Sequence, residues 1–352
     1  MRQGRLKAPG THRVAYYHCI SRVVDRQFIF SDVQKERFVG LMREYEEFCA
    51  VRVVTFSVMS NHFHLLVEVP KRPDQLPTDE ELCTRIERLS GEGGSGTFRQ
   101  TLERLRRDGH HQAAEELRAR IFARMWDISG FMKLLKQRFT QSYNRQKGRK
   151  GTLWEERFKS VLIEGAGEAL ASTAAYIDLN SVRAKLVDDP KDYRWCGYSE
   201  AMAGKRRALE GLQVVVAGAQ RVSTEQVQST EVLPLYRIWL FGQGEQNEGT
   251  NSSGQPLRPG FSWEAVAKVL EEKGRVPLSE YLRLRVRYFA DGAVLGTQEF
   301  VDEIFHALRH RFGVKRKDGA RRLRGVESTE LFALRDLRVR VVQFSQEGEP
   351  GG

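Results

Sequence analysis

Two β-rich runs separated by only two residues constrain the fold of this chain more than any other feature. Arg52–Met59 and His62–Val69 are rich in Val, Phe and Leu, and Ser60-Asn61 between them predicts a tight hairpin turn. The N-terminal half of the chain is therefore expected to be built around an antiparallel pair of strands.

Alternating and helical patterns surround this hairpin. Residues 13–30 read as an opening strand, because Val14, Tyr16, His18 and Ile20 recur at period two. Ser31-Asp32-Val33-Gln34 then has the form of a capping box, and apolar residues at helical spacing predict a helix to about Cys49.

The same reading continues beyond residue 125. Ile128–Tyr143 predicts an amphipathic helix broken at Gly148–Gly151, Thr152–Glu164 a strand or hairpin, and Glu168–Val187 a helix that stops before Pro190. The order β-α-β-β-α-β-α predicts an α+β fold, a ferredoxin-like antiparallel sheet with helices packed on it.

The chain is too long for a single hydrophobic core, so we expect appendages or a second domain. We predict a first domain at 10–200, with an inserted helical segment at about 71–125 that contains a flexible Gly- and Ser-rich run at 90–96. A linker is predicted at 201–260, because 242–260 is rich in Gly, Asn, Ser, Gln and Pro. A mainly helical, basic C-terminal domain is predicted at 261–345, with helices at Trp263–Glu272, Leu278–Phe289 and Thr297–Phe312.

Composition restricts the partners and the setting. A net charge of +11, from 57 Lys and Arg against 46 Asp and Glu, is compatible with a polyanionic partner. No apolar run is long enough to cross a bilayer, and the N-terminus has no apolar core of a secretory signal. The four cysteines form no CxxC pair, so a reducing cytoplasm is the expected setting.

His62-Phe63-His64 is the first motif that carries chemistry. Residues i and i+2 of a strand project from the same face, so the two imidazoles would lie side by side while Phe63 points into the core. Two imidazoles form half of a site for a divalent ion such as Mg²⁺ or Mn²⁺. The alternative is a pair of histidines that bind nothing.

Tyr176 and Asn180 form the second motif. At i and i+4 of a helix they share a face, which would place a phenol nucleophile beside an amide oxygen able to act as a third ligand. The alternative is a helix-packing tyrosine and a surface asparagine.

A basic and aromatic belt follows the Ile128–Tyr143 helix. Its cations could grip phosphates and its rings could stack on unpaired bases, whereas a solvated helix end with core aromatics would give the same composition. Its members are Lys133, Lys136, Arg138, Arg145, Lys147, Arg149, Lys150, Trp154, Arg157, Phe158 and Lys159. A second basic stretch, Arg309–Arg324, is either a DNA-binding arm or a solvated helix end.

Three separated motifs resemble one family in the right order. Met59-Ser60-Asn61-His62-Phe63-His64-Leu65-Leu66-Val67 resembles the HUH signature of single-tyrosine transposases. Tyr176-Ile177-Asp178-Leu179-Asn180-Ser181-Val182-Arg183-Ala184-Lys185-Leu186-Val187 resembles the tyrosine helix of the branch called REP-associated tyrosine transposases, and Gly151–Ser160 is similar to that branch as well. The resemblance covers about residues 10–200. Three later segments, Tyr236–Leu240, Arg287–Gly292 and Arg335–Arg338, are similar to the arm of longer members of the family.

The resemblance implies an HUH fold and a mechanism. His62, His64 and Asn180 would hold Mg²⁺ or Mn²⁺, and Tyr176 would attack the scissile phosphate to give a 5′-phosphotyrosine and a free 3′-hydroxyl. Contacts to single-stranded or hairpin repeat DNA are expected from Arg22, Arg26, Lys136, Arg138, Arg145, Lys147, Arg149, Lys150, Trp154, Arg157, Lys159 and Arg183. The branch also implies a monomer rather than a homodimer, acting in the bacterial cytoplasm at the nucleoid.

The sequence departs from the family pattern at three places. Asn180 stands where the insertion-sequence branch has Gln, Ser181 stands where the REP-associated branch usually has Pro, and the insertion at 71–125 is longer than expected.

Two other functions compete with transposition. A domesticated DNA-binding protein could keep the fold without turnover, although His62, His64, Tyr176 and Asn180 are all present. A ferredoxin-like RNA-binding module would leave Tyr176 unexplained and lacks strands rich in aromatic residues.

Overall fold

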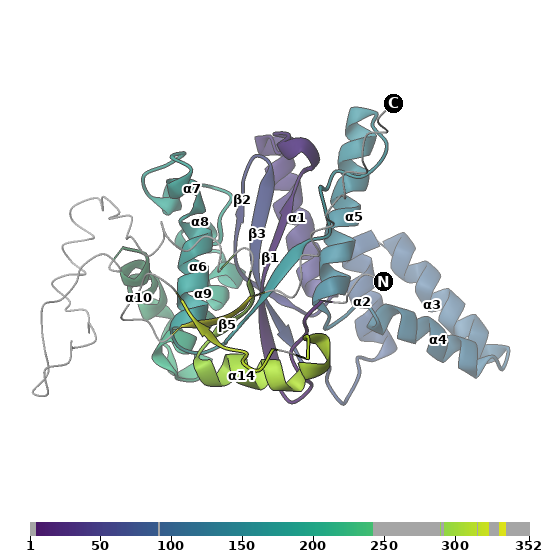
Figure 1. Ribbon diagram of the computed structural model, residues 1–352. Helices are drawn as coiled ribbons and strands as arrows, with labels where there is room; N and C mark the ends of the chain where they lie inside the picture. The colour runs from purple at the N-terminus through teal and green to yellow at the C-terminus, as the bar shows by residue number, and fades with distance from the viewer. Residues whose placement is uncertain are drawn as a thin grey trace, which may run out of the picture.

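A seven-stranded sheet flanked by helices forms the centre of the molecule (Figure 1). The computed structural model describes residues 5–90, 92–241, 289, 292–314, 316–323 and 331–335. Its strands are β1 (Val14–Arg22), β2 (Arg52–Val58), β3 (His62–Pro70), β4 (Lys159–Ile163), β5 (Gly292–Gly296), β6 (Arg321–Arg322) and β7 (Phe332–Arg335), in the spatial order β2-β3-β1-β4-β5-β7-β6.

The first four strands confirm the predicted α+β fold. Helix α1 (Asp32–Phe48) connects β1 to β2, α5 (Ile128–Lys147) leads to β4, and α6 (Glu168–Asp178) follows β4. β1 pairs antiparallel with both β3 and β4, and β2 pairs antiparallel with β3. This spatial order with these connections is the ferredoxin-like arrangement that the sequence predicts.

Each face of the sheet carries its own layer of helices and its own apolar core. One face packs against α6, α8 (Gly197–Met202), α9 (Arg206–Gln220) and α10 (Ser229–Phe241), and the opposite face packs against α1 and α5 (Figure 1). Residues of β3 alternate between these cores, with Leu66 in the first and Phe63 and Leu65 in the second. A side chain's place along a strand therefore decides which helices it meets.

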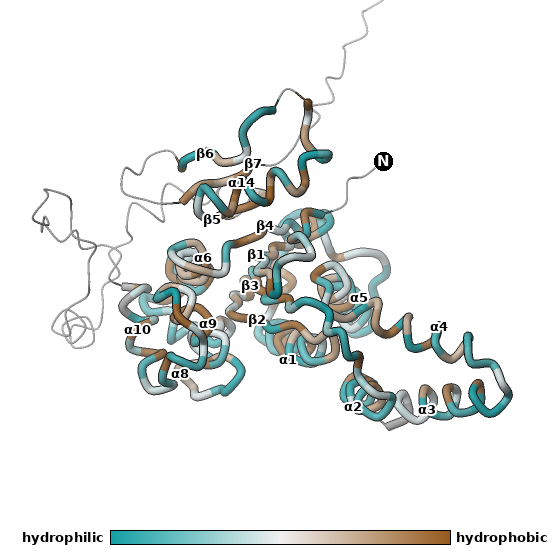
Figure 2. The backbone as a smooth tube through the Cα atoms, turned by 90° about the horizontal axis from the view of Figure 1, so that it is seen from below, coloured by the Kyte–Doolittle hydropathy of each residue, from teal (hydrophilic) through white to brown (hydrophobic). Residues whose placement is uncertain are grey.

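The insertion between β3 and α5 is helical, as predicted. It consists of α2 (Asp79–Ser90), α3 (Glu92–Arg107) and α4 (His111–Phe122), which project away from the sheet (Figure 2). Leu82, Phe98, Leu102 and Phe122 are buried in a small core of its own. The prediction of a flexible run at 90–96 is wrong, because α3 begins at Glu92 and places Phe98 and Leu102 into that core.

The prediction of a linker at 201–260 is wrong for residues 201–241. α9 and α10 lie there, and Leu212, Val215 and Tyr236 are buried in the same core as Tyr176. Apolar residues at helical spacing in α9 drive this packing, whereas the Gly- and Ser-rich composition begins only at 242, outside the described residues.

The predicted separate, mainly helical C-terminal domain is also corrected. β5 pairs in parallel with β4, and β7 pairs with β5, so the described C-terminal residues extend the N-terminal sheet. Ala293, Val294 and Leu295 form a short apolar run that is buried because it continues the sheet beyond β4. Of the predicted helices, Thr297–Phe312 corresponds to α14 (Gln298–Ala307) and a following 3₁₀ turn, Trp263–Glu272 lies outside the described residues, and only Phe289 of Leu278–Phe289 is described.

The capping box predicted at Ser31 is wrong in its side-chain contacts. Ser31 occupies the N-cap position of α1 without a side-chain capping hydrogen bond. The Gln34 amide, which a capping box would turn back to the helix start, instead donates to Gln146 of α5. Within the described residues, no helix is long and apolar enough to cross a membrane.

Candidate active site

His62 and His64 lie on β3 with their rings beside each other. The ring centroids are 5.1 Å apart, and the planes are nearly perpendicular at 81°. Phe63 between them is fully buried on the opposite face, against Phe38 at 4.6 Å and Trp154 at 5.6 Å. The predicted alternation of this strand is confirmed, and its rigid packing fixes both imidazoles on the face that meets α6.

A third histidine, His18, completes this cluster. It lies on β1 and is fully buried, with Nε2 2.9 Å from His64 Nδ1 and Nδ1 2.8 Å from the carbonyl oxygen of Phe289. His18 was not predicted as a site residue. Its place in the alternation of residues 14–20 puts it on one face of the strand, but only the register of β1 against β3 brings it to His64.

Tyr176 of α6 packs directly against the histidines. Its ring centroid is 5.7 Å from that of His64 and 5.8 Å from that of His18, in edge-to-face geometry. Phe289 stacks on the Tyr176 ring at 4.8 Å, and the Arg183 guanidinium lies 4.8 Å from the ring centroid. These neighbours leave Tyr176 only 3% exposed. One chain therefore brings together the phenol and the histidines that the sequence singles out.

Asn180 opens α7 (Asn180–Arg183), one helical turn after Tyr176. The predicted continuous helix is divided at Leu179, yet helical hydrogen bonds run on across it, from Leu179 N–H to Ala175 O and from Arg183 N–H to Leu179 O. Asn180 therefore keeps its place on the Tyr176 side. Its Nδ2 is buried and has no hydrogen-bond partner in the described part of the chain.

The electrostatic environment keeps the imidazoles neutral. Burial lowers the pKa of His18 to about 4, and burial together with the positive charge of Arg22 lowers the pKa of His62 to about 4. The pKa of His64 lies well below its usual value, first because of burial and then because of neighbouring positive charge, including Arg183. A neutral imidazole is the form that binds a metal ion.

Among the described residues, no group of three or more His, Cys, Asp or Glu side chains could hold a metal ion. The side-chain amide of Asn180 is a neutral group of another kind, whose oxygen is a possible partner of the two imidazoles around a cation.

Residues 11–75 match the family model for transposase IS200 like. The resemblance predicted from the sequence is thereby confirmed for a segment that includes His18, His62 and His64 and ends before Tyr176. A solved structure described as a REP-associated tyrosine transposase bound to a REP hairpin is 12% identical, with a TM-score of 0.34, covering 57% of this chain and 86% of that chain. No curated protein matches the chain.

Asp178, the last residue of α6, links this helix to β2 and α10. This fully buried carboxyl accepts hydrogen bonds from Thr55 Oγ1 of β2 at 2.7 Å, from the Tyr236 hydroxyl of α10 at 2.5 Å and from the Tyr198 backbone N–H at 3.3 Å. Burial raises the pKa of Asp178 to about 7. Sequence reasoning missed this residue, because its partners come from three distant segments of the chain.

The predicted DNA-contact residues fall into separate groups. Arg22 and Arg26 are exposed at the end of β1, with Arg22 opposite His62 in register, and Arg183 lies over Tyr176. Arg22 and Arg183 thus lie near the histidine cluster, whereas the backbone carbonyl oxygen of Arg26 accepts a hydrogen bond from Asn61.

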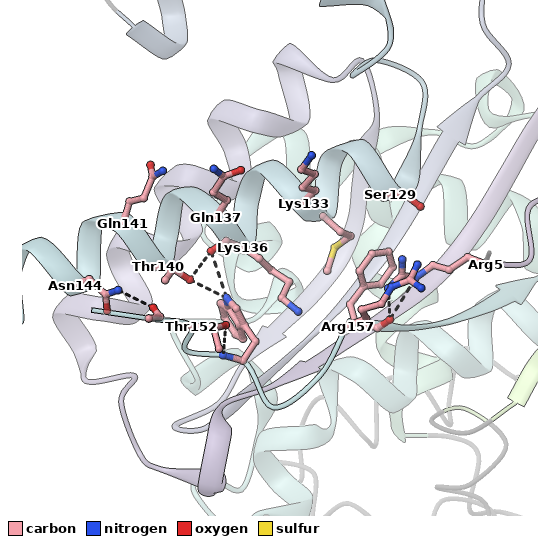
Figure 3. Close-up of a pocket in the computed structure, with 14 residues that line it drawn as sticks. Arg5, Ser129, Lys133, Lys136, Gln137, Thr140, Gln141, Asn144, Thr152 and Arg157 are labelled. Atoms are coloured by element: carbon pink, nitrogen blue, oxygen red, sulfur yellow. Dashed lines mark hydrogen bonds between the residues drawn. The ribbon is translucent and has the colours of Figure 1, made fainter. Parts of the chain in front are cut away.

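A second group lines an open pocket of about 660 Å³ along α5 (Figure 3). Lys133, Lys136 and Arg157 contribute to the wall of this pocket, which we call the Lys136 pocket. Arg5 lines it as well, and its guanidinium lies over the Phe158 ring at 3.3 Å. Burial, together with the positive charge of Arg5, lowers the pKa of Lys136 to about 8.

Trp154 also lines this pocket, but its predicted role as an open stacking ring does not fit its position. The ring is 8% exposed, and its Nε1–H donates to Thr140 Oγ1 at 2.9 Å. It packs against Phe63 because the segment before β4 closes the core under β3. Phe158, at 7% exposure, is a core residue as well.

The remaining belt residues lie outside this pocket. Arg138 is exposed on α5. Burial raises the pKa of Tyr45 of α1, and the positive charge of Arg138 offsets part of that rise. The other cations follow the C-terminal end of α5 and the start of β4, where most are exposed: Arg145, Lys147, Arg149, Lys150 and Lys159. These five residues, which we call the basic margin, lie at the end of α5, in the loop after it and at the start of β4.

Proposed function

We propose that this protein is a metal-dependent transposase that cleaves single-stranded DNA and transfers the strand through a 5′-phosphotyrosine on Tyr176. The contact of the Tyr176 ring with His64, at 5.7 Å between centroids in one chain, carries the proposal. Hairpin-forming repeat DNA as the substrate follows from the sequence resemblance of the tyrosine helix.

His62, His64 and Asn180 would hold the divalent ion. Both rings are held at Nδ1, by Asn61 Oδ1 at 2.7 Å and by His18 Nε2 at 2.9 Å, so Nε2 is the candidate ligand atom of each. The candidate ligand atom of Asn180 is its carbonyl oxygen Oδ1, because the amide nitrogen Nδ2, which is buried without a hydrogen-bond partner in the described part of the chain, is a donor and does not bind a cation. Two neutral imidazoles and an amide suit Mn²⁺ or Mg²⁺, which would polarise the scissile phosphate when bound.

Tyr176 supplies the nucleophile. Its hydroxyl loses a proton to water as the oxygen bonds to phosphorus, while the bond from phosphorus to the 3′ oxygen breaks and that oxygen takes up a proton. The phosphotyrosine keeps the energy of the broken phosphodiester, so a 3′-hydroxyl can attack it and rejoin a strand without another energy source. Arg183 and Arg22 would offset the charge of the phosphate.

The DNA strand must displace at least one of the two side chains, Phe289 and Arg183, that cover Tyr176. At 3% exposure, Tyr176 cannot meet a phosphate while Phe289 and Arg183 hold their places against it. The Lys136 pocket and the basic margin beyond it would hold DNA outside the cluster, where their cations neutralise phosphates.

The cluster favours action by one chain. The rings of Tyr176 and His64 meet within one chain, so the proposed site needs no tyrosine from a second copy, and the monomer stays a prediction. Cytoplasmic location at the nucleoid stays a prediction.

A covalent adduct is the test of this function. The full chain is incubated with labelled hairpin single-stranded DNA and Mn²⁺, and the products are separated on a denaturing gel. A protein-linked band is expected that disappears with chelator and in Tyr176→Phe. Tyr143→Phe is the matched control, because Tyr143 lies on α5 away from the histidines and should leave the adduct unchanged.

The alternative, a domesticated DNA-binding protein without turnover, predicts a different result. Hairpin DNA would be retained in a native gel, no hairpin tested would give an adduct, and Tyr176→Phe would bind like the wild type. An adduct that persists in Tyr176→Phe would instead assign the nucleophile elsewhere.

A further inference from the structure

A line of polar contacts runs from the backbone of Phe289 through His18 to His64. His18 Nδ1 lies 2.8 Å from the Phe289 carbonyl oxygen, and His18 Nε2 lies 2.9 Å from His64 Nδ1. His18 is 0% exposed and His64 is 4% exposed, so water does not compete strongly for these contacts. The positions of the protons along this line follow from the chemistry of its first member.

A backbone carbonyl can only accept a hydrogen bond, so His18 Nδ1 must carry a proton. A second proton on His18 would place a charge in a fully buried site beside uncharged aromatic rings, which is costly. His18 Nε2 therefore bears a lone pair and accepts from His64 Nδ1–H. That bond leaves the lone pair of His64 on Nε2.

We propose that His18 is a positioning residue that fixes His64 in the Nδ1–H tautomer and so presents its Nε2 lone pair to the divalent ion. This role rests on the proposed function, since it is a role toward that ion. The hydrogen bond made by the second ring nitrogen commonly orients a metal-bound histidine and sets its tautomer. The backbone carbonyl oxygen of Phe289 is the first acceptor of this line, so a residue from the C-terminal half of the chain takes part in the site.

His62 reaches the same tautomer by a separate route. Asn61 Nδ2 donates to the Arg26 carbonyl oxygen at 3.2 Å, which turns Asn61 Oδ1 toward His62 Nδ1 at 2.7 Å. His62 Nδ1 then donates and its Nε2 keeps the lone pair. Two unrelated backbone carbonyls thus give both histidines the same proton arrangement, as expected if both Nε2 atoms have one common target.

The tautomers can be read in the full-length, metal-free protein. Selective ¹⁵N labelling of the eight histidines and long-range ¹H–¹⁵N spectra distinguish Nδ1–H from Nε2–H rings. We expect His18, His62 and His64 all to be protonated on Nδ1. A wild-type His64 ring protonated on Nε2 would overturn the proposal, whatever the protein does to DNA.

Variants of His18 then test the consequence for metal binding. His18→Phe keeps a ring but removes the acceptor, so His64 should populate both tautomers and Mn²⁺ affinity, measured by calorimetry, should fall about 10- to 100-fold. His18→Gln can still accept from His64 through its amide oxygen and should bind Mn²⁺ nearly as the wild type does. Ile20→Val is the packing control, because Ile20 pairs with His64 in register without joining the line.

Equal Mn²⁺ affinity in His18→Phe and the wild type would also overturn the proposal, provided the variant melts cooperatively. If His18→Phe does not fold, the wild-type spectrum and His18→Gln still decide it. A wild type that shows the expected tautomers but binds no Mn²⁺ would contradict the metal part of the proposed function while leaving the proton arrangement established.

Discussion

The two faces of the central sheet differ in where their polar side chains lie, buried on one face and mostly exposed on the other. On the face toward α6, His18, His64 and Asp178 are buried, and each is held by hydrogen bonds from distant parts of the chain. On the face toward α5, the interior is mainly aromatic and apolar, and most charges lie outside it around the Lys136 pocket and the end of α5. The buried Glu46 of α1, which accepts a hydrogen bond from the Val53 backbone N–H of β2, is an exception.

Alternation along a single strand produces this contrast. His62 and His64 point to one face, and Phe63 points to the other. A fixed chemical centre needs satisfied buried polar groups, which rigidify a site, whereas a surface that grips a polyanion needs exposed cations on a stable base. The comparison predicts that the faces respond differently to substitution.

The largest effect is expected at Phe63, which lies between the two histidines on β3 and is fully buried in the core toward α5. Phe63→Ala should lower the free energy of unfolding by about 3–5 kcal/mol, because it opens a cavity beside Phe38 and Trp154. Urea denaturation measures the change. Phe28→Ala is the matched control, since Phe28 is 81% exposed and should shift stability by less than about 0.5 kcal/mol. A Phe63 variant as stable as the Phe28 variant would contradict the burial of Phe63 in the core toward α5.

Asp178 tests the polar anchoring of the tyrosine helix. Asp178→Ala leaves the hydroxyls of Thr55 and Tyr236 buried without their acceptor, so a loss of about 1–3 kcal/mol is expected in the same denaturation experiment. Asp188→Ala, an exposed aspartate in the following turn, should be nearly neutral. Similar stabilities for the two variants would show that the buried carboxyl does not anchor α6.

Glycines test whether α9 belongs to the α6 face. A Cβ at Gly211 would lie 2.2 Å from the Val54 carbonyl oxygen of β2, so Gly211→Ala must push α9 away and should cost about 1–3 kcal/mol. Gly40 of α1 has nothing within 4 Å of its Cβ position, and Gly40→Ala should stabilise the protein by about 0.5–1 kcal/mol. Melting temperatures should therefore move in opposite directions. Stabilisation by both substitutions would mean that α9 is not packed on β2.

The sequence predicts the parts of the fold and site that depend on local periodicity. The hairpin, the order of the elements along the chain from β1 to α6 and the HxH alternation follow from local patterns, and the Tyr176–Asn180 spacing follows from a helical one. The strands β5, β6 and β7 are not among the predicted elements. The prediction of a linker over 201–241 is wrong because the Gly- and Ser-rich composition begins only at 242, whereas the residues before it include α9, whose apolar stripe packs on β2.

The remaining features of the site depend on strand pairing and helix packing, which the sequence pattern does not reveal. In the sequence, His18 is one of several alternating residues of a strand, and only the pairing of β1 with β3 brings it near His64. Asp178 has the pattern of a carboxylate at a helix end, and only the packing of α10 brings the Tyr236 hydroxyl to it. Phe289 follows Tyr176 by more than a hundred residues, and no local pattern links the two. Such long-range pairs are set by the packing of whole elements.

The smallest effect is expected at Lys136, which lines the pocket along α5 on the face with exposed cations. Its pKa of about 8 means that it is mostly charged at pH 7 and mostly neutral at pH 9. Raising the pH should therefore remove one phosphate-neutralising cation, and the slope of log affinity against log salt for single-stranded DNA should become shallower by about 0.7 or less. Fluorescence anisotropy at several salt concentrations measures this slope. Lys136→Arg keeps its charge at pH 9 and should show no such change, whereas an identical pH response in both proteins would place the titrating group elsewhere.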